Sequence, residues 1–173
     1  MKHYLYPDAY ASSAYAVPYE KLYEMGYRGI IYDVDNTLVP HGAPADERAI
    51  AHFERLRKIG FKAVLLSNNK EPRVKSFNDK VGAMYIYKAN KPSTKGYLKA
   101  MEMMGTDTGT TFFVGDQLFT DVWGAKRSGI KSYLVKQIDK KEEIQIILKR
   151  RLEWIVLFFY GFYEKKHGNN LPL

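Results

Sequence analysis

In the stretch GIIYDVDNTLVP, residues 29–40, a run of apolar and aromatic side chains is followed by two aspartates, an asparagine and a threonine. Residues 29–33 are nearly continuous in apolar side chains, which is typical of a strand covered by helices on both faces. Asp33 and Asp35 stand two positions apart, so an extended chain projects both carboxylates to the same side. The stretch therefore predicts a buried strand with a pair of acids at its carboxyl end.

Strand-like and helix-like segments alternate from this stretch to residue 135. The further predicted strands are KAVLLSN (62–68), MYIY (84–87), TTFFVGD (110–116) and KSYLV (131–135). The predicted helices cover residues 45–59, 71–80, 93–104 and 118–128, and glycines, which are common at helix ends, follow them. The alternation predicts an α/β fold with a doubly wound, mostly parallel sheet. Ligands bind such sheets at the carboxyl ends of the strands.

The chain of 173 residues fits one domain, 1–173, with a distinct segment at each end. Residues 1–28 form an aromatic arm, whose tyrosines are expected to pack across the sheet rather than stack on a ligand. Residues from about 142–165 form a C-terminal amphipathic and apolar helix. This helix is too short to span a bilayer. Two uses of it stay open: contact with a membrane interface, and packing on the core or on a second copy.

The composition excludes several classes of protein. The chain has no cysteine, which rules out disulfides, thiolate metal sites and cysteine-dependent phosphatases. The N-terminus lacks the apolar segment of a secretory signal, so we expect a cytoplasmic protein, with peripheral contact to the inner face of the membrane as an option. A net charge of +8 and a pI near 9.4 favour nucleic acid, anionic lipid headgroups or phosphorylated substrates without choosing among them. The four histidines show no metal-ligand spacing, and His52 is expected to be partly exposed.

Polar side chains gather at the predicted carboxyl ends of the strands. They are Asp33, Asp35 and Thr37 after the first strand, Ser67 and Asn68 after the second, Lys91 after the third, and Asp116 and Asp121 after the fourth. Carboxylates this close stay ionised only with a cation among them, and an oxygen-only ligand set suits Mg²⁺. Lys91 and Ser67 fit a bound phosphoryl group. Asp33 can then attack phosphorus, while Asp35 protonates the departing oxygen and later activates water.

These polar clusters resemble, in order, the four motifs of the haloacid dehalogenase (HAD) type phosphohydrolases. The resemblance rests on DVDNT, on LLSNN through Ser67, on Lys91 within NKP and on GDQLFTD, and it covers residues 29–135. More closely, YLYPDAY in the arm, DVDNTLV and VGDQLFTDV are similar to the YqeG-type phosphatases of HAD subfamily IIIA, which are related to phosphatidylglycerophosphate phosphatases. The subfamily resemblance extends over nearly the whole chain.

The resemblance implies a HAD-like Rossmannoid fold that holds Mg²⁺. The ion would be bound by side-chain oxygens of Asp33 and Asp116 and by the backbone carbonyl of Asp35. Asp121 is implied to lie beside this metal site, where it orients Lys91 or a water on the metal.

Phosphate binding is implied for Ser67 and Lys91, with Asn68 adding donors and Thr37 fixing the first turn. The gaps between the first three motifs are too short for a large cap domain, so an open crevice is expected, which admits a phosphate carried on a large molecule.

The sequence and the resemblance together predict a Mg²⁺-dependent phosphomonoesterase that works through an aspartyl-phosphate. Its expected substrate is phosphatidylglycerophosphate, a lipid headgroup, which gives it a role in phosphatidylglycerol synthesis. The alternatives are a HAD phosphatase for another phosphate ester or a nucleic-acid end, and a phosphate- or RNA-binding scaffold without turnover.

Overall fold

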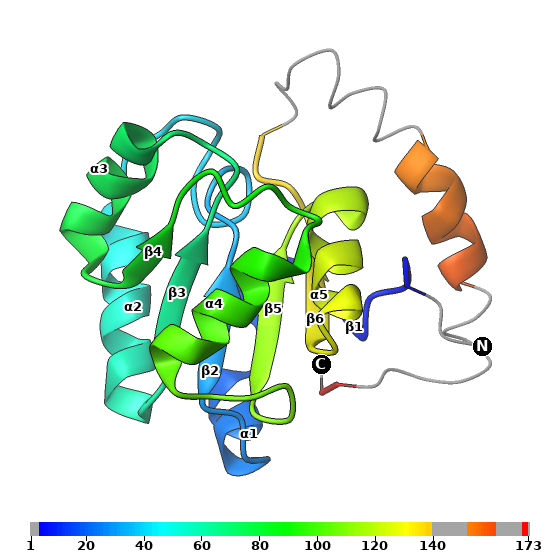
Figure 1. Ribbon diagram of the computed structural model, residues 1–173, viewed down its shortest axis with the longest axis horizontal. Helices are drawn as coiled ribbons and strands as arrows, with labels where there is room; N and C mark the ends of the chain where they lie inside the picture. Colours follow the sequence, from blue (N-terminus) through cyan, green and yellow to red (C-terminus); the bar gives the residue numbers. More distant parts are fainter. Residues whose placement is uncertain (1–3, 140–151, 162–170, 173) are drawn as a thin grey trace.

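A parallel sheet forms the centre of the computed structural model, which describes residues 4–139, 152–161 and 171–172 (Figure 1). Its six strands follow the order β1-β6-β5-β2-β3-β4, and every neighbouring pair is parallel. They are β1 (Ala9–Ala11), β2 (Gly29–Tyr32), β3 (Lys62–Leu66), β4 (Met84–Ile86), β5 (Thr111–Gly115) and β6 (Lys131–Val135). The predicted doubly wound sheet is confirmed.

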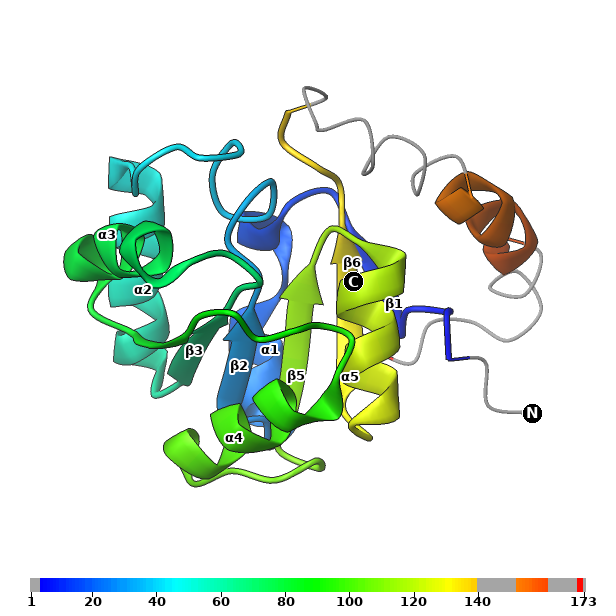
Figure 2. The same ribbon diagram turned by 45° about the horizontal axis from the view of Figure 1, so that its top comes forward.

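Helices cover both faces of this sheet. They are α1 (Tyr19–Glu24), α2 (Glu47–Ile59), α3 (Glu71–Val81), α4 (Thr94–Met104) and α5 (Trp123–Arg127), with a short turn η1 (Ala14–Ala16) and a π-helical turn η2 (Leu118–Val122). Side chains of α1, α2 and α3 share one apolar cluster, and those of α4 and α5 share another. In Figures 1 and 2, α4 and α5 accordingly lie on one side of the sheet, and α1 and α2 on the other.

Strand β2 shows how the two clusters are built. Its side chains alternate, since Ile30 and Tyr32 belong to the cluster of α1 to α3 while Ile31 belongs to that of α4 and α5. All three side chains are fully buried, and burying one aliphatic side chain stabilises a fold by about 1.5–3 kcal/mol. Both faces of β2 are therefore used for apolar packing. The polar side chain of Asp33 lies just after the carboxyl end of the strand.

Three features differ from the expectations of the sequence. Strand β1 adds a sixth strand at the edge of the sheet, paired with β6, and it lies within the aromatic arm. The helix expected over 118–128 is divided into the π-helical turn η2 and the short α5. His52, expected to be partly exposed, is only 5% exposed, and its Nε2 lies 3.0 Å from the hydroxyl of Tyr32.

The C-terminal helix is described over residues 152–161 (orange in Figure 1), and residues 142–151 and 162–165 of the predicted helix lie outside the described part. Val156 and Leu157 pack on a small apolar cluster that includes Leu118 of η2. Within the described ranges, no helix combines the length and the apolar character needed to cross a bilayer.

The order of the strands places the topological switch point, where a crevice is expected, between β2 and β5. From β2 the chain continues outward to β3 and β4, whereas from β5 it continues to β6 on the opposite side. Ligands bind doubly wound sheets at such a switch point, outside the carboxyl ends of the strands. The connections from β2 to β3 and from β3 to β4 carry only α2 and α3 with their loops, so residues 33–93, all described, contain no large cap domain.

Candidate active site

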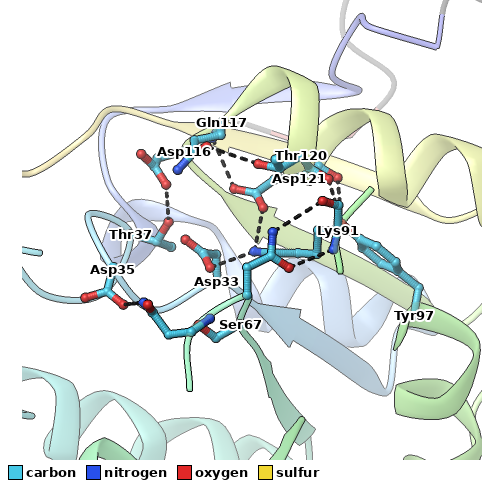
Figure 3. Close-up of polar contacts among 12 residues, drawn as sticks. Asp33, Asp35, Thr37, Ser67, Lys91, Tyr97, Asp116, Gln117, Thr120 and Asp121 are labelled. Atoms are coloured by element: carbon cyan, nitrogen blue, oxygen red, sulfur yellow. Dashed lines mark hydrogen bonds and ion pairs between the residues drawn. The ribbon is translucent and has the colours of Figure 1, made fainter. Parts of the chain in front are cut away.

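Asp33, Asp116 and Asp121 meet at the crevice between β2 and β5 (Figure 3). Asp33 follows β2, Asp116 follows β5, and Asp121 lies in η2. All three are buried, and each offers a carboxylate oxygen within 4.8 Å of the oxygens of the other two. Carboxylates at this spacing repel one another unless positive charge lies among them.

Lys91 supplies positive charge to this cluster from the segment between β4 and α4. Its Nζ lies 2.6 Å from Oδ1 of Asp33 and 2.7 Å from Oδ1 of Asp121. The side chain of Asn68 holds the backbone of Lys91, because its Oδ1 accepts from Lys91 N at 2.7 Å and its Nδ2 donates to Lys91 O at 3.2 Å. The Asn68 amide is thus engaged with the lysine backbone, whereas the resemblance implied a donor to phosphate.

Burial and charge oppose each other at the Lys91–Asp33 pair. Burial raises the pKa of Asp33 well above its usual value; the charge of Lys91 lowers it, and the charges of Asp121 and Asp116 raise it further. Burial would lower the pKa of Lys91, but the charges of Asp121 and Asp33 outweigh that effect and raise it. Lys91 therefore stays an ammonium, and it is the principal group that favours ionised Asp33.

The Asp35 side chain points away from Lys91 toward the loop after β3 (Figure 3). Its Oδ1 accepts from Gly42 N at 2.7 Å and lies 2.9 Å from Nη2 of Arg73, in the first turn of α3. Its Oδ2 accepts from Nδ2 of Asn69 at 2.8 Å. Asp35 therefore lies at the same edge of the sheet as Asp33 but is bound to a different set of partners.

Thr37 and Ser67 complete the set predicted from the sequence. Thr37 Oγ1 donates to Oδ1 of Asp116 at 3.0 Å, which links the loop after β2 to the end of β5. Ser67 directly follows β3, is buried, and accepts from Asn69 N at 3.1 Å through its Oγ. All the predicted residues thus come together at one edge of the sheet.

The turn η2 is held in place by contacts from three directions. The hydroxyl of Tyr97, on α4, donates to the backbone oxygens of Thr120 at 3.0 Å and Asp121 at 3.2 Å. A β-carbon at position 115 would lie 2.5 Å from Oδ2 of Asp121, so Gly115 is needed for the close approach of this acid. Leu118 N donates to Oε1 of the buried Glu153 at 2.8 Å, which joins the turn to the C-terminal helix.

Sequence reasoning missed four of these supporting side chains: Asn69, Arg73, Tyr97 and Glu153. Asn69 lies inside the quoted LLSNN motif, so its position was visible although its bond to Asp35 was not. The other three act across long separations in the chain, such as the 35 residues between Leu118 and Glu153, and no local pattern identifies such contacts.

The residues present fit a magnesium ion. Asp33, Asp116 and Asp121 provide carboxylate oxygens, the hard ligands that Mg²⁺ prefers, and the ion commonly uses one or two of them together with water and phosphate oxygens. The arrangement offers buried carboxylates, an ammonium and a candidate metal site at one edge of the sheet, and these groups suit phosphoryl transfer.

Comparisons with known proteins agree with this chemistry. A HAD-hydrolase-like family model matches residues 88–147. The chain is 36% identical over 158 residues to "Probable phosphatase YqeG" of Bacillus subtilis (strain 168), covering 91% of this chain and 92% of that protein. It is 26% identical over 154 residues to the chloroplastic/mitochondrial phosphatidylglycerophosphate phosphatase 1 of Arabidopsis thaliana, covering 82% of this chain and 44% of that protein.

Solved structures share the fold at low sequence identity. A protein of Listeria monocytogenes serotype 4b has a TM-score of 0.52 at 15% identity, over 72% of this chain and 99% of that one. A protein assigned to the HAD hydrolases, from Streptomyces avermitilis MA-4680, has a TM-score of 0.51 at 14% identity, over 71% and 77% of the two chains. These likenesses concern the fold, whereas the Bacillus relative matches along most of both sequences. The chain belongs to the haloacid dehalogenase superfamily, and within it to the phosphatases of the YqeG type.

Proposed function

We propose that this phosphatase is a Mg²⁺-dependent phosphomonoesterase that works through an aspartyl-phosphate and hydrolyses phosphatidylglycerophosphate to phosphatidylglycerol and inorganic phosphate. The observation that carries the reaction is the distance of 2.6 Å between Lys91 Nζ and Asp33 Oδ1, inside a cluster of three buried acids. The charge of Lys91 opposes the effect of burial on the pKa of Asp33 and so favours the nucleophilic carboxylate, and the same ammonium can bind phosphate oxygens.

Asp33 is the proposed nucleophile. A bond forms between its carboxylate oxygen and phosphorus as the bond from phosphorus to the alcohol oxygen breaks. Lys91 and the hydroxyl of Ser67 hold the oxygens of the transferring group. Asp33 and Asp116, with the backbone carbonyl of Asp35, would hold Mg²⁺, which when bound supplies positive charge that screens these acids from the substrate. Water then cleaves the aspartyl-phosphate and regenerates the Asp33 carboxylate.

Asp35 is the proposed acid and base. It donates a proton to the departing alcohol oxygen and later takes one from the attacking water, which restores its starting state. In the structure its carboxylate is bound to Gly42 N, Asn69 and Arg73. Delivery of the proton therefore requires the Asp35 side chain to leave these partners and turn toward the crevice.

The lipid substrate is supported by three observations of different kinds. The Arabidopsis relative acts, by its name, on phosphatidylglycerophosphate. Residues 33–93, all described, contain no large cap domain that would close the crevice over a small substrate. The net charge of +8 favours an anionic membrane surface, at which the C-terminal helix would make peripheral contact on the inner face.

A panel of substrates tests the assignment. Purified protein with Mg²⁺ is given phosphatidylglycerophosphate in mixed micelles, beside sugar phosphates, nucleotides, a phosphorylated oligonucleotide end and a phosphopeptide. We expect the lipid to have the highest kcat/KM. A soluble ester or a nucleic-acid end with a much higher kcat/KM would overturn the lipid assignment but not the assignment as a phosphatase.

The reaction itself is tested with Asp33→Asn, which keeps the shape of the side chain. Hydrolysis of para-nitrophenyl phosphate should disappear while the circular-dichroism spectrum and the unfolding midpoint show a folded protein. If the parent protein shows no Mg²⁺-dependent turnover on any substrate of the panel, a phosphate- or RNA-binding scaffold becomes the better description.

A further inference from the structure

An apolar hollow of about 560 Å³ is lined in part by the turn η2, which also carries Asp121 of the candidate active site. Three segments line it: the N-terminal arm through Tyr4, the chain after β5 through Phe119 and Trp123, and the C-terminal helix through Ile155 and Phe159. The volume lies within the range of about 300–1,000 Å³ that is usual for small-molecule sites. Every one of these five side chains is apolar or aromatic, so the hollow is suited to a hydrocarbon rather than to a second phosphate.

The hollow and the phosphate crevice share one short piece of chain. Phe119 lines the hollow, and Asp121, in the same turn η2, bonds to Lys91 in the crevice. The C-terminal wall is fixed to this turn as well, because Glu153 accepts from Leu118 N at 2.8 Å. The turn η2 therefore connects the phosphate crevice at Lys91 to the apolar hollow.

One cation, Arg127, contacts residues of both parts. The guanidinium of Arg127 stands 5.5 Å from the centre of the Trp123 ring, and its Nη1 donates to Pro92 O, next to Lys91, at 3.4 Å. Arg127 thus contacts one residue of the hollow and one residue next to Lys91. Its positive charge suits the phosphodiester of an anionic lipid whose terminal phosphate is held by Lys91.

The side chains at the hollow are also more exposed than their chemistry favours. Phe159 is 58% exposed, Ile155 49% and Trp123 37%, and the neighbouring Trp154 is 68% exposed. Contiguous exposed apolar surface of this kind marks sites of interaction. Burying it against hydrocarbon gives about 25 cal/mol per Å².

We propose that this hollow binds an acyl chain of the phospholipid whose phosphate occupies the crevice. The proposal rests on the lipid phosphatase function above and deepens it, because it makes one acyl chain part of the recognised substrate. The outer face of the C-terminal helix, with Trp154, then faces the lipid surface from which that chain is drawn.

The two tryptophans of the chain give a direct test, because Trp123 lines the hollow and Trp154 does not. Trp154→Phe leaves Trp123 as the only tryptophan, and Trp123→Phe leaves Trp154. Each variant is titrated with a short-chain phosphatidylglycerol that carries bromine on its acyl chains, below its micelle concentration, and with the unbrominated lipid as the control. We expect saturable quenching of Trp123 and little quenching of Trp154. Equal quenching of both, or none of Trp123, would overturn the acyl site.

A pair of substitutions on the same helix tests the role in turnover. Ile155→Glu puts a charge into the hollow, and Phe158→Glu puts the same charge on the helix outside the lining. Each rate on a short-chain monomeric phosphatidylglycerophosphate is divided by that variant's rate on para-nitrophenyl phosphate. The ratio should fall roughly tenfold or more in Ile155→Glu relative to Phe158→Glu. Equal ratios would count against the proposal.

The two assays also separate this proposal from the proposed function. Quenching of Trp123 without lipid hydrolysis would support the acyl site and contradict the proposed lipid phosphatase function. Lipid hydrolysis with neither quenching nor a difference between the two glutamate variants would support the proposed function and overturn the acyl site. The quenching could also disappear at protein concentrations at which analytical ultracentrifugation shows a dimer. That result would assign the hollow to a second copy and overturn the acyl site.

Discussion

The Nζ of Lys91 lies 2.6 Å from Oδ1 of Asp33, although 58 residues separate the two in the chain. The same nitrogen lies 2.7 Å from Oδ1 of Asp121, so one ammonium neutralises part of a cluster of three buried acids. Lys91 therefore affects both the ionisation of the proposed nucleophile and the stability of the fold.

Replacing Lys91 by methionine should change both properties. Buried carboxylates that lose their partner are strongly destabilising, so the free energy of unfolding without divalent cations should fall by about 3 kcal/mol. Turnover of para-nitrophenyl phosphate should fall roughly 10²-fold or more, because a cation on the transferring phosphate is lost. Denaturant titrations in EDTA and in Mg²⁺ should show a larger stabilisation by Mg²⁺ in the variant than in the parent. The exposed Lys95→Met is the matched control, and equal effects of both substitutions would contradict the role of Lys91.

Asp35→Asn should distinguish good from poor leaving groups. The amide keeps the size of the side chain but cannot donate a proton as an acid, so hydrolysis of alkyl phosphates should slow by roughly 10²-fold or more. Aryl phosphates, whose leaving group needs little protonation, should lose less in the first step. Quenched-flow measurements should also show a longer-lived phospho-enzyme. Asp79→Asn, at the exposed pair with Lys75, serves as the control, and equal losses on both substrate types would exclude Asp35 as the acid.

Much of the site could be predicted from the sequence because of one geometric rule. The carboxyl ends of parallel strands meet at one edge of the sheet, so polar residues after β2, β3 and β5 had to converge once the strands were recognised. Asp33, Ser67 and Asp116 were found in this way.

Other features could not be found because no local pattern encodes them. Strand β1 has only three residues and pairs with β6 from the far end of the chain. One partner of Asp35 is Arg73, which sequence alone presents as one cation among many on a basic chain. His52 lies on an amphipathic helix, and its burial depends on aromatic neighbours from the arm, such as Tyr15 and Tyr19.

Glu153 should be a positioning residue for the turn that carries Asp121. Glu153→Leu leaves the backbone N–H of Leu118 without this acceptor, and an unsatisfied buried donor costs about 1–3 kcal/mol. We expect kcat on para-nitrophenyl phosphate to fall several-fold while KM changes little, because Asp121 and Lys91 shift together. Glu153→Gln keeps an acceptor oxygen for Leu118 N and should restore most of the rate. A role that depended only on the negative charge of Glu153 would not be rescued by glutamine. Glu102→Leu, on the exposed face of α4, is the control, and equal rates for the Leu and Gln variants at position 153 would refute the role.

His52 should make the stability of the fold depend on pH. Burial lowers the pKa of His52 from 6.5 to about 4, and the charges of Arg55 and Arg48 add to the shift. Between these two values the unfolded chain binds a proton that the folded chain does not, so the free energy of unfolding decreases as the pH falls. The contribution is fully present above pH 6.5 and is lost on acidification to about pH 4; it amounts to at most about 3 kcal/mol.

The free energy of unfolding is measured by urea titration for the parent protein and for His52→Gln between pH 7.5 and pH 4. Steps of roughly half a pH unit are sufficient, because a shift of one pKa unit corresponds to about 1.36 kcal/mol. Glutamine can accept from the Tyr32 hydroxyl but does not titrate, so the difference in unfolding free energy between the two proteins should shrink or reverse in favour of the variant as the pH falls. His41→Gln, at an exposed loop position, is the matched control substitution. A difference between parent and His52→Gln that stays constant over this range would mean that His52 is already charged or accessible in the folded protein.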